Sequence, residues 1–324
     1  MNYSFTYSKF IVNLIRDIER ELSQIDLNPT DRNLEIQLRR KNQIQTITGT
    51  CQIEGNTLSK ELVTEILSGK RVAGNEKEII EVKNAYTLYE SLEILNPESK
   101  KDFLKAHKIL LTDLNSEAGK IRKVNVGVGN SQSLKYVAPN FKEVPTLLDN
   151  LFKQIKSPLF DEITTSALIH LEIESIHPVT DGNGRIGRFW QTLYLAKNVS
   201  LIFQYLNIEG LIKQKQQKYY EALIKSQSNK NSNYFVEFIL KLMLESLKDY
   251  KSSQKTFSSG KTRVLSVKPV FKKKAFSRLE YMKEIGVTSS ATATRDLTEA
   301  VEMKILETVG EMNQTRYRFI LKAL

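Results

Sequence analysis

One stretch of twelve residues, 177–188, gathers side chains that could act on a phosphorylated ligand. The imidazole of His177 titrates near neutral pH and is suited to taking a proton from an attacking group. Asp181 supplies a carboxylate of the kind that holds Mg²⁺ beside phosphate oxygens. Arg185 and Arg188 are three residues apart, so on a helix their guanidinium groups project from one face and can share one anion.

Between these side chains lies a glycine-rich turn that is itself suited to anions. Gly182 and Gly184 allow backbone conformations, and close approaches of a ligand, that other residues do not. The N–H groups of such a turn, followed directly by a helix, attract phosphate through their orientation and the helix dipole. The stretch therefore predicts a site for a nucleotide di- or triphosphate with Mg²⁺, in which His177 deprotonates the attacking group. A plain loop between two helices is the competing interpretation.

Two helices are expected to hold this turn in place. The apolar run 167–173 predicts a buried helix that ends near Ser175. The run 185–197 predicts a second helix, with Ile186 and Trp190 available for burial.

Composition places limits on the class of protein. The chain has 324 residues, 40% of them hydrophobic, which predicts a sizeable core in two domains or in one large domain with an appendage. The single cysteine excludes an intramolecular disulfide, and three scattered histidines give no zinc pattern. His107 and His170 lie among apolar residues and are predicted to be hydrogen-bonded core histidines.

Charge and hydropathy bear on partners and location. No run approaches the roughly 20 apolar residues of a membrane span, and residues 1–10 lack a secretory signal. A cytoplasmic protein that does not bind membranes is therefore expected. The net charge of +11 is compatible with a nucleic-acid or acidic-protein partner.

Residues 177–188 resemble the signature of the Fic family, His-Pro-Phe-x-Asp/Glu-Gly-Asn-Gly-Arg-x-x-Arg. Every position matches except Val179, where the family has phenylalanine. The resemblance implies a mainly α fold, a helical bundle with a β-hairpin flap. It also implies a protein adenylyltransferase, which moves AMP from ATP to a Ser, Thr or Tyr hydroxyl of a target protein, or of itself, and releases pyrophosphate.

On this resemblance each residue of the stretch has a role. His177 is the general base, and Asp181 holds Mg²⁺. Residues 182–184 cradle the α- and β-phosphates, and Asn183 helps to stabilise the charge that develops at the transferring phosphorus. The nucleotide-binding set follows the turn into the helix: Gly182, Asn183, Gly184, Arg185, Ile186, Gly187 and Arg188. A helix after the motif borders the adenine pocket in this family. Of the adjacent tyrosines there, one is predicted to be core and Tyr220 is assigned to the pocket.

A second motif precedes the first. The pattern Thr50-x-x-x-Glu54-Gly55 is typical of a helix that ends at a glycine, with Glu54 in solvent. It also resembles the inhibitory Ser/Thr-x-x-x-Glu-Gly/Asn motif of Fic proteins that have an N-terminal inhibitory helix. On that resemblance Glu54 pairs with Arg188, occupies the arginine that should bind the γ-phosphate of ATP, and inhibits the protein.

Residues 119–137 differ from their helical surroundings. β-Branched residues alternate up to a Gly-Asn pair at 129–130, which predicts a hairpin with its turn there. On the resemblance this hairpin is the flap over the active site, and its edge docks a segment of the target protein by main-chain hydrogen bonds. A hairpin without function is the other interpretation.

Four regions are predicted along the chain: an N-terminal helical region with the inhibitory helix (1–100), a Fic catalytic core (101–250), a polar linker (251–274) and a small winged-helix-like module (275–324). Helix, turn, helix and hairpin follow one another in the last region, which is the winged-helix order. Residues 261–324 hold 13 Lys and Arg against 7 Asp and Glu. DNA binding and protein contacts, including a homodimer, are both open for this module.

Two alternatives to AMP transfer stay open. The first is the removal of AMP, in which Glu54 orients a water molecule. The second is a DNA-binding regulator whose Fic-like part only senses ATP and which acts through residues 261–324.

Overall fold

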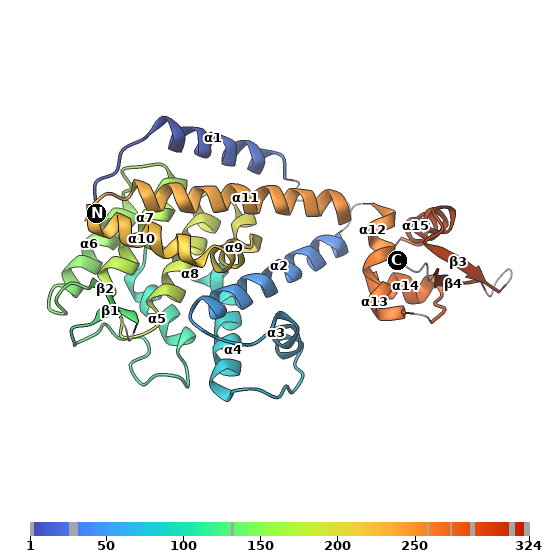
Figure 1. The fold of residues 1–324 in the computed structure, drawn as a ribbon, viewed down its shortest axis with the longest axis horizontal. Helices are drawn as coiled ribbons and strands as arrows, with labels where there is room; N and C mark the ends of the chain where they lie inside the picture. The colour runs from blue at the N-terminus through green and yellow to red at the C-terminus, as the bar shows by residue number, and fades with distance from the viewer. Residues whose placement is uncertain are drawn as a thin grey trace. The chain divides into compact units, whose positions relative to one another are not determined.

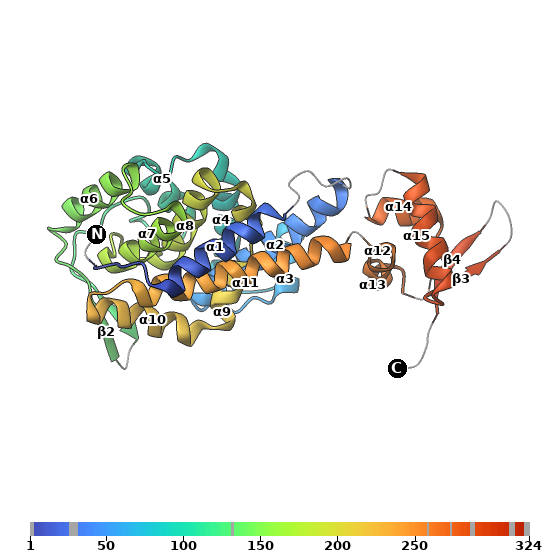
Figure 2. The ribbon, with the colours of Figure 1, turned by 90° about the horizontal axis from the view of Figure 1, so that it is seen from above.

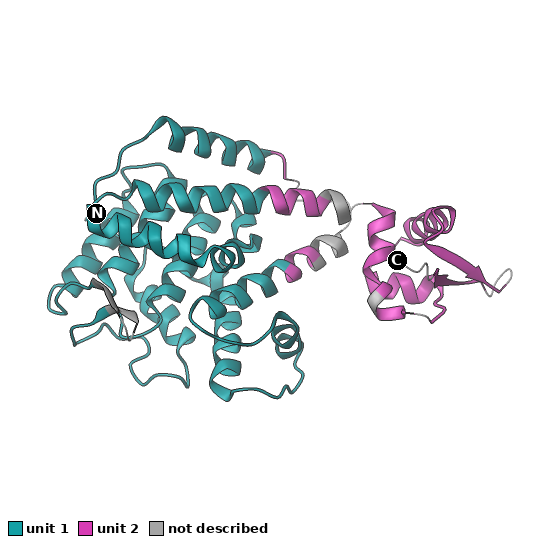
Figure 3. Cartoon of the chain, in the orientation of Figure 1, with its two compact units in different colours: residues 1–23, 42–247 teal, residues 24–41, 248–324 magenta. Residues whose placement is uncertain are grey.

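The computed structural model describes residues 3–25, 32–130, 133–257, 259–272, 274–285, 289–310 and 315–320, and the chain is mainly helical over these ranges (Figure 1). It divides into two compact units (Figure 3). Unit 1 comprises residues 1–23 and 42–247, and unit 2 comprises residues 24–41 and 248–324. None of the described helices is long and apolar enough to cross a membrane.

Two buried helices, α7 (Glu162–Ile176) and α8 (Asn183–Asn198), pack along each other in the middle of unit 1 (Figure 2). Every residue of α7 after Glu162 is buried. Because both helices are surrounded by others, neither has a solvent-facing polar stripe of the usual kind. These are the two helices that the sequence predicts on either side of the glycine-rich turn, and Ile186 and Trp190 are buried as expected.

The other helices of unit 1 cover this pair. Trp190 makes edge-on contacts with Phe103 and Phe152, with ring centroids 5.2 and 6.0 Å away, so α5 and α6 are fixed against α8. The remaining helices with residues in unit 1 have these bounds: α1 (Lys9–Ser23), α2 (Arg32–Ile53), α3 (Lys60–Leu67), α4 (Glu76–Glu90), η1 (Ser91–Ile94), α5 (Lys100–Leu110), α6 (Val144–Lys156), η2 (Leu201–Tyr205), α9 (Ile208–Gln214), α10 (Gln216–Asn229) and α11 (Asn233–Phe257).

The predicted hairpin is present but shorter than 119–137. Strands β1 (Gly127–Asn130) and β2 (Ser133–Val137) pair antiparallel, with Gly127 opposite Val137 and a register irregularity after Val128. The Gly-Asn pair at 129–130 lies in β1 and not in the turn, which falls at residues outside the described ranges. Residues 119–126 form no strand because their polar contacts go to the turn before α8, as shown below.

Unit 2 has its own core. Its elements are α12 (Gly260–Ser266), α13 (Lys268–Phe271), α14 (Arg278–Ile285), α15 (Ser290–Glu302), β3 (Leu306–Val309) and β4 (Arg316–Phe319), the two strands being antiparallel. Helix, helix and hairpin occur in the predicted order, but the turn before α15 and the connection between β3 and β4 lie outside the described residues. The winged-helix assignment and DNA binding therefore stay predictions.

The segment predicted as a linker, 251–274, is largely helical. α11 continues to Phe257, and α12 places Val264 and Val267 in the core of unit 2. The segment looked like a linker because its composition is polar. In the structure one of its polar residues is part of a buried ion pair: Arg263 donates from Nε and Nη2 to the two carboxylate oxygens of Asp296, at 2.6 and 2.5 Å.

Candidate active site

The turn between α7 and α8 is built from two backbone conformations that are rare outside glycine. His177 ends α7 with φ 49° and ψ 59°, and Gly182 precedes α8 with φ 81°. The side-chain amide of Asn183 closes the turn, because its Oδ1 accepts from the Val179 N–H at 3.1 Å and its Nδ2 donates to the Val179 carbonyl at 2.8 Å. Val179 is fully buried, so it anchors the turn in the core.

His177 is half-buried at one side of this turn. Its Nδ1 lies 3.4 Å from the Glu174 carbonyl oxygen, which can only accept, so the contact places the proton on Nδ1 and leaves Nε2 as a base. Burial lowers the pKa of His177 because it disfavours the imidazolium. The side chain is therefore kept neutral and able to accept a proton at neutral pH.

His107 and His170 are hydrogen-bonded core histidines, as predicted. His107 Nδ1 accepts from the Gly119 N–H at 2.9 Å, so Nε2 carries the proton and donates to the Asp181 carbonyl at 3.0 Å. His170 lies between Gln191, whose Oε1 is 2.6 Å from Nδ1, and the hydroxyl of Tyr219. His107 thus fixes the turn from outside, while His170 lies beneath α8, against Gly187.

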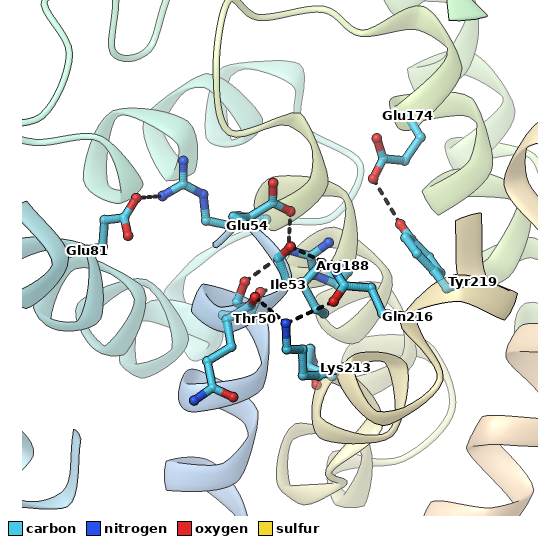
Figure 4. Close-up of polar contacts among 12 residues, drawn as sticks. Thr50, Ile53, Glu54, Glu81, Glu174, Arg188, Lys213, Gln216 and Tyr219 are labelled. Atoms are coloured by element: carbon cyan, nitrogen blue, oxygen red, sulfur yellow. Dashed lines mark hydrogen bonds and ion pairs between the residues drawn. The ribbon is translucent and has the colours of Figure 1, made fainter. Parts of the chain in front are cut away.

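Arg188 is held by the end of α2, and this pair is the one that the sequence predicts. Its Nη2 lies 2.7 Å from Glu54 Oε1, and its Nε and Nη2 also donate to the hydroxyl and carbonyl of Thr50, at 3.1 and 3.2 Å (Figure 4). Arg188 is 2% exposed and the Glu54 side chain 31% exposed. Burial alone would raise the pKa of Glu54, but the charge and hydrogen bond of Arg188 hold it below its usual value.

Arg185 has a carboxylate of its own. Its Nη1 lies 2.8 Å from Glu81 Oε1 on α4, and its Nη2 lies 3.3 Å from Asp181 Oδ1. The other oxygen of Glu81 accepts from Asn56 Nδ2 at 2.9 Å, directly after the inhibitory motif. Arg185 Nε is buried and has no hydrogen-bond partner among the described residues.

A further carboxylate lies beside the Arg188–Glu54 pair. Glu174 is buried beneath the turn and accepts from the Tyr219 hydroxyl at 3.0 Å (Figure 4). Burial, and then the charge of Glu54, raise the pKa of Glu174 to about 7. The space is so tight that a Cβ added to Gly184 would lie 2.5 Å from Glu54 Oε1, 3.0 Å from Arg188 Nη1 and 3.2 Å from Glu174 Oε1.

The end of α2 is fastened to α9 and α10 near this cluster. Lys213 Nζ donates to the Gln52 carbonyl and Gln216 Nε2 to the Ile53 carbonyl, each at 2.8 Å. Tyr219 is fully buried, whereas Tyr220 is partly exposed and its hydroxyl lies 3.5 Å from Gln216 Nε2. The expected division into one core and one accessible tyrosine is therefore present.

The structure places most of the predicted residues around the turn, but not all of them could contact a ligand with a side chain. Ile186 is in the core and Gly187 packs against His170, so both could reach a ligand only through the backbone. Sequence reasoning missed Glu81 and Glu174. Each lies on a helix that carries other acidic residues, so no local pattern marks it.

The comparisons with known proteins agree with this geometry. The Fic/DOC family model matches residues 97–195, which contain the whole turn. A crystal structure of a Fic family protein from Desulfovibrio desulfuricans G20 is 31% identical and superposes with a TM-score of 0.77 over 98% of both chains. The chain belongs to the Fic family.

Curated Fic relatives carry a functional name. Protein adenylyltransferase fic-1 of Caenorhabditis elegans is 32% identical over 163 residues, which are 46% of this chain and 31% of that protein. Protein adenylyltransferase Fic of Aedes aegypti is 29% identical over 194 residues, 56% of this chain and 36% of that protein. The aligned segment thus spans about a third of the length of these relatives.

Proposed function

We propose that this Fic protein is a protein adenylyltransferase, which moves AMP from ATP to a Ser, Thr or Tyr hydroxyl of a target protein and of itself. The observation that carries the proposal is the meeting of a neutral imidazole, His177, with a turn whose amides and two arginines are arranged for a polyphosphate. The name of the curated relatives supports it.

In the proposed reaction His177 Nε2 accepts the proton of the attacking hydroxyl. The hydroxyl oxygen bonds to the α-phosphorus while the bond from that phosphorus to the pyrophosphate oxygen breaks. The N–H groups of residues 182–184 stabilise charge on the α- and β-phosphates, and Asn183 serves by holding their geometry through Val179. Arg185 Nε is the free donor for the β-phosphate, and Tyr220 borders the adenine.

Asp181 fits a Mg²⁺ that is held mainly by the nucleotide. The described residues contain no group of three His, Cys, Asp or Glu that could hold a metal by themselves. Asp181 is 55% exposed and lies next to Arg185, where one carboxylate and the phosphate oxygens could share an ion. Bound there, Mg²⁺ would neutralise charge on the phosphates.

Glu54 is proposed as the inhibitor of this reaction. Its carboxylate occupies Nη2 of Arg188, the group assigned to the γ-phosphate, so it competes with a phosphate oxygen for that donor and repels it. ATP would therefore bind with its γ-phosphate displaced until Glu54 moves away. The target protein is proposed to dock on the flap, where β1 and β2 offer main-chain groups.

The test uses the variant Glu54→Gly, with His177→Ala added to it. We expect label from α-³²P-ATP to enter the protein in the first variant and to fall by roughly 10² to 10⁴ in the second, the usual effect of removing a general base. Calorimetric ATP binding should be the same in both. Label from γ-³²P-ATP should not enter; if it does, the chemistry is phosphate transfer and the proposal is wrong.

The same labelled protein separates transfer from removal of AMP. Incubated with the wild-type chain and without ATP, it should keep its label. Rapid release of labelled AMP would identify the wild type as an enzyme that removes AMP, with Glu54 orienting water.

A further inference from the structure

A single buried guanidinium, that of Arg122, joins both ends of the flap to the turn that carries His177. Arg122 is 2% exposed. Its Nε donates to the His177 carbonyl at 2.7 Å, its Nη1 to the Val124 carbonyl at 2.7 Å and its Nη2 to the Pro139 carbonyl at 2.6 Å. Val124 lies before β1 and Pro139 after β2, so the side chain contacts the segments that lead into and out of the hairpin.

Arg122 also contacts the peptide groups on either side of His177. Its backbone N–H donates to the Pro178 carbonyl at 3.0 Å, and its Nη2 lies 3.4 Å from the Ile176 carbonyl. Three consecutive carbonyls of the turn therefore face one residue. His177 has a left-handed backbone conformation, which residues other than glycine rarely adopt. Arg122 holds the carbonyl oxygens of residues 176–178 and so stabilises this conformation.

The planar fork of arginine explains why this residue type is present. Guanidinium offers five N–H donors in a rigid plane and has no acceptor. The contacts of the Arg122 guanidinium described here are with carbonyl oxygens, which only accept. The leading segment 119–126 is fastened to the turn a second time through His107, which links the Gly119 N–H to the Asp181 carbonyl.

We propose that Arg122 is a positioning residue, which fixes the register between the flap and the imidazole of His177 and so sets where a flap-bound hydroxyl meets the base. This inference rests on the proposed adenylyl transfer. ATP is held by the other side of the turn, so loosening Arg122 should misplace the hydroxyl and the base while ATP affinity is kept. Misplacement by about 1 Å is enough to slow a reaction by roughly 10²-fold.

The charge of Arg122 provides a second, independent readout. Burial lowers the pKa of His177 most, the contact with the Glu174 carbonyl raises it, Arg122 lowers it, and the carboxylates of Glu54 and Asp181 raise it. Removing the charge at 122 should therefore raise the pKa of His177. Arg122→Lys keeps the charge but loses the planar guanidinium. It should leave the pKa of His177 unchanged, although the carbonyls lose hydrogen-bond partners.

The experiment compares Arg122→Lys and Arg122→Gln in the full chain with Glu54→Gly, beside the control Lys123→Gln at an exposed neighbour. The protein is labelled with ¹⁵N-histidine; it has only three histidines, and His177→Gln assigns the relevant signal. The pKa of His177 is read by NMR titration. The maximal rate of label incorporation and the KM for ATP are measured with α-³²P-ATP.

We expect both Arg122 variants to lose tenfold or more in maximal rate, with the KM for ATP changed less than twofold and Lys123→Gln unaffected. Only Arg122→Gln should raise the pKa of His177, which moves the acid limb of its rate profile to higher pH. Unchanged His107 and His170 signals establish that a variant is folded. If Arg122→Gln does not fold, Arg122→Lys alone tests the positioning role.

Parental rates in both variants, or a raised KM at a parental maximal rate, would overturn the inference. So would an unchanged pKa of His177 in a folded Arg122→Gln. If the Glu54→Gly parent itself incorporates no label, the proposed adenylyl transfer fails. The NMR titration still decides whether Arg122 controls His177, because it needs no turnover.

Discussion

The two units each contain a buried arginine paired with a carboxylate, and the pairs differ in how completely each arginine is used. In unit 2, Arg263 meets Asp296 through two N–H groups, Asp296 is fully buried, and the Tyr281 hydroxyl donates to the same carboxylate at 3.0 Å. In unit 1, Arg188 meets Glu54 through one N–H group, and Glu54 is 31% exposed.

The difference shows which pair is structural and which is exchangeable. A bidentate, fully buried pair has no route by which water or a ligand can replace the carboxylate. Arg188 has further contacts with Thr50, and Glu54 lies partly exposed just after the end of α2. An arginine–carboxylate pair is thus bidentate and fully buried in unit 2, and single and partly exposed in unit 1.

The largest effect is expected from Asp296→Asn. Removing one charge leaves Arg263 buried without its counter-ion, which typically costs about 3–5 kcal/mol. Hydrogen exchange of residues 290–302 should rise steeply, while Trp190 fluorescence, which reports unit 1, keeps its urea midpoint. The double variant Arg263→Met with Asp296→Leu should recover most of the protection. Exchange at the wild-type level in Asp296→Asn would show that the pair is not structural.

Substitution of Glu54 should lower stability less than Asp296→Asn does, and it should clearly raise activity. One hydrogen bond between charged groups contributes about 1.5–3 kcal/mol, which corresponds to roughly 10- to 100-fold in competition with the γ-phosphate. Self-modification should rise in the order wild type, Glu54→Gln, Glu54→Gly. Glu93→Gln, at an exposed site, is the control. Equal labelling in all four proteins would remove the inhibitory role.

The smallest effect is a change in pH dependence, and it comes from Glu174, a second carboxylate beside the Arg188–Glu54 pair. The pKa of Glu174 is raised to about 7, so between its unfolded pKa and pH 7 the folded chain keeps a proton that the unfolded chain has released. Glu174 therefore contributes a stability that falls as pH rises through this window, by at most about 1.4 kcal/mol per pH unit, whereas His107, His170 and His177, whose pKa values are lowered, contribute in the opposite direction.

Glu174→Gln should remove the falling contribution, so the stability of the variant should rise with pH more steeply than that of the wild type between pH 5 and 7.5, measured from urea midpoints of Trp190 fluorescence. Glu54, whose pKa is lowered, loses its contribution only as the pH falls below this range, so it does not interfere. Parallel profiles for the variant and the wild type would mean that Glu174 titrates at the same pH in both states.

The parts of the site that lie together in the sequence could be predicted. Residues 177–188 carry their chemistry within one turn, and Glu54 could be matched to Arg188 because the short inhibitory motif resembles a known one. Arg122 could not be found in this way. It stands between lysines, Lys120 and Lys123, and only the tertiary fold shows that its side chain points inward to carbonyls.

The errors have the same physical origin. The segment 251–274 looked like a linker because composition cannot show that Arg263 is buried against Asp296 on α15. Glu81 and Glu174 escaped notice because a glutamate on a helix is usually solvated. Apolar periodicity locates helices, but partners of buried charges come from segments far apart in the chain.

Gly184 lies where no side chain can be accommodated. Any residue with a side chain there would strike three charged groups at once, those of Glu54, Arg188 and Glu174. A side chain at position 184 would therefore displace Arg188 together with Glu54. If Glu54 inhibits as proposed, activating mutations should be found at the end of α2 and not at Gly184.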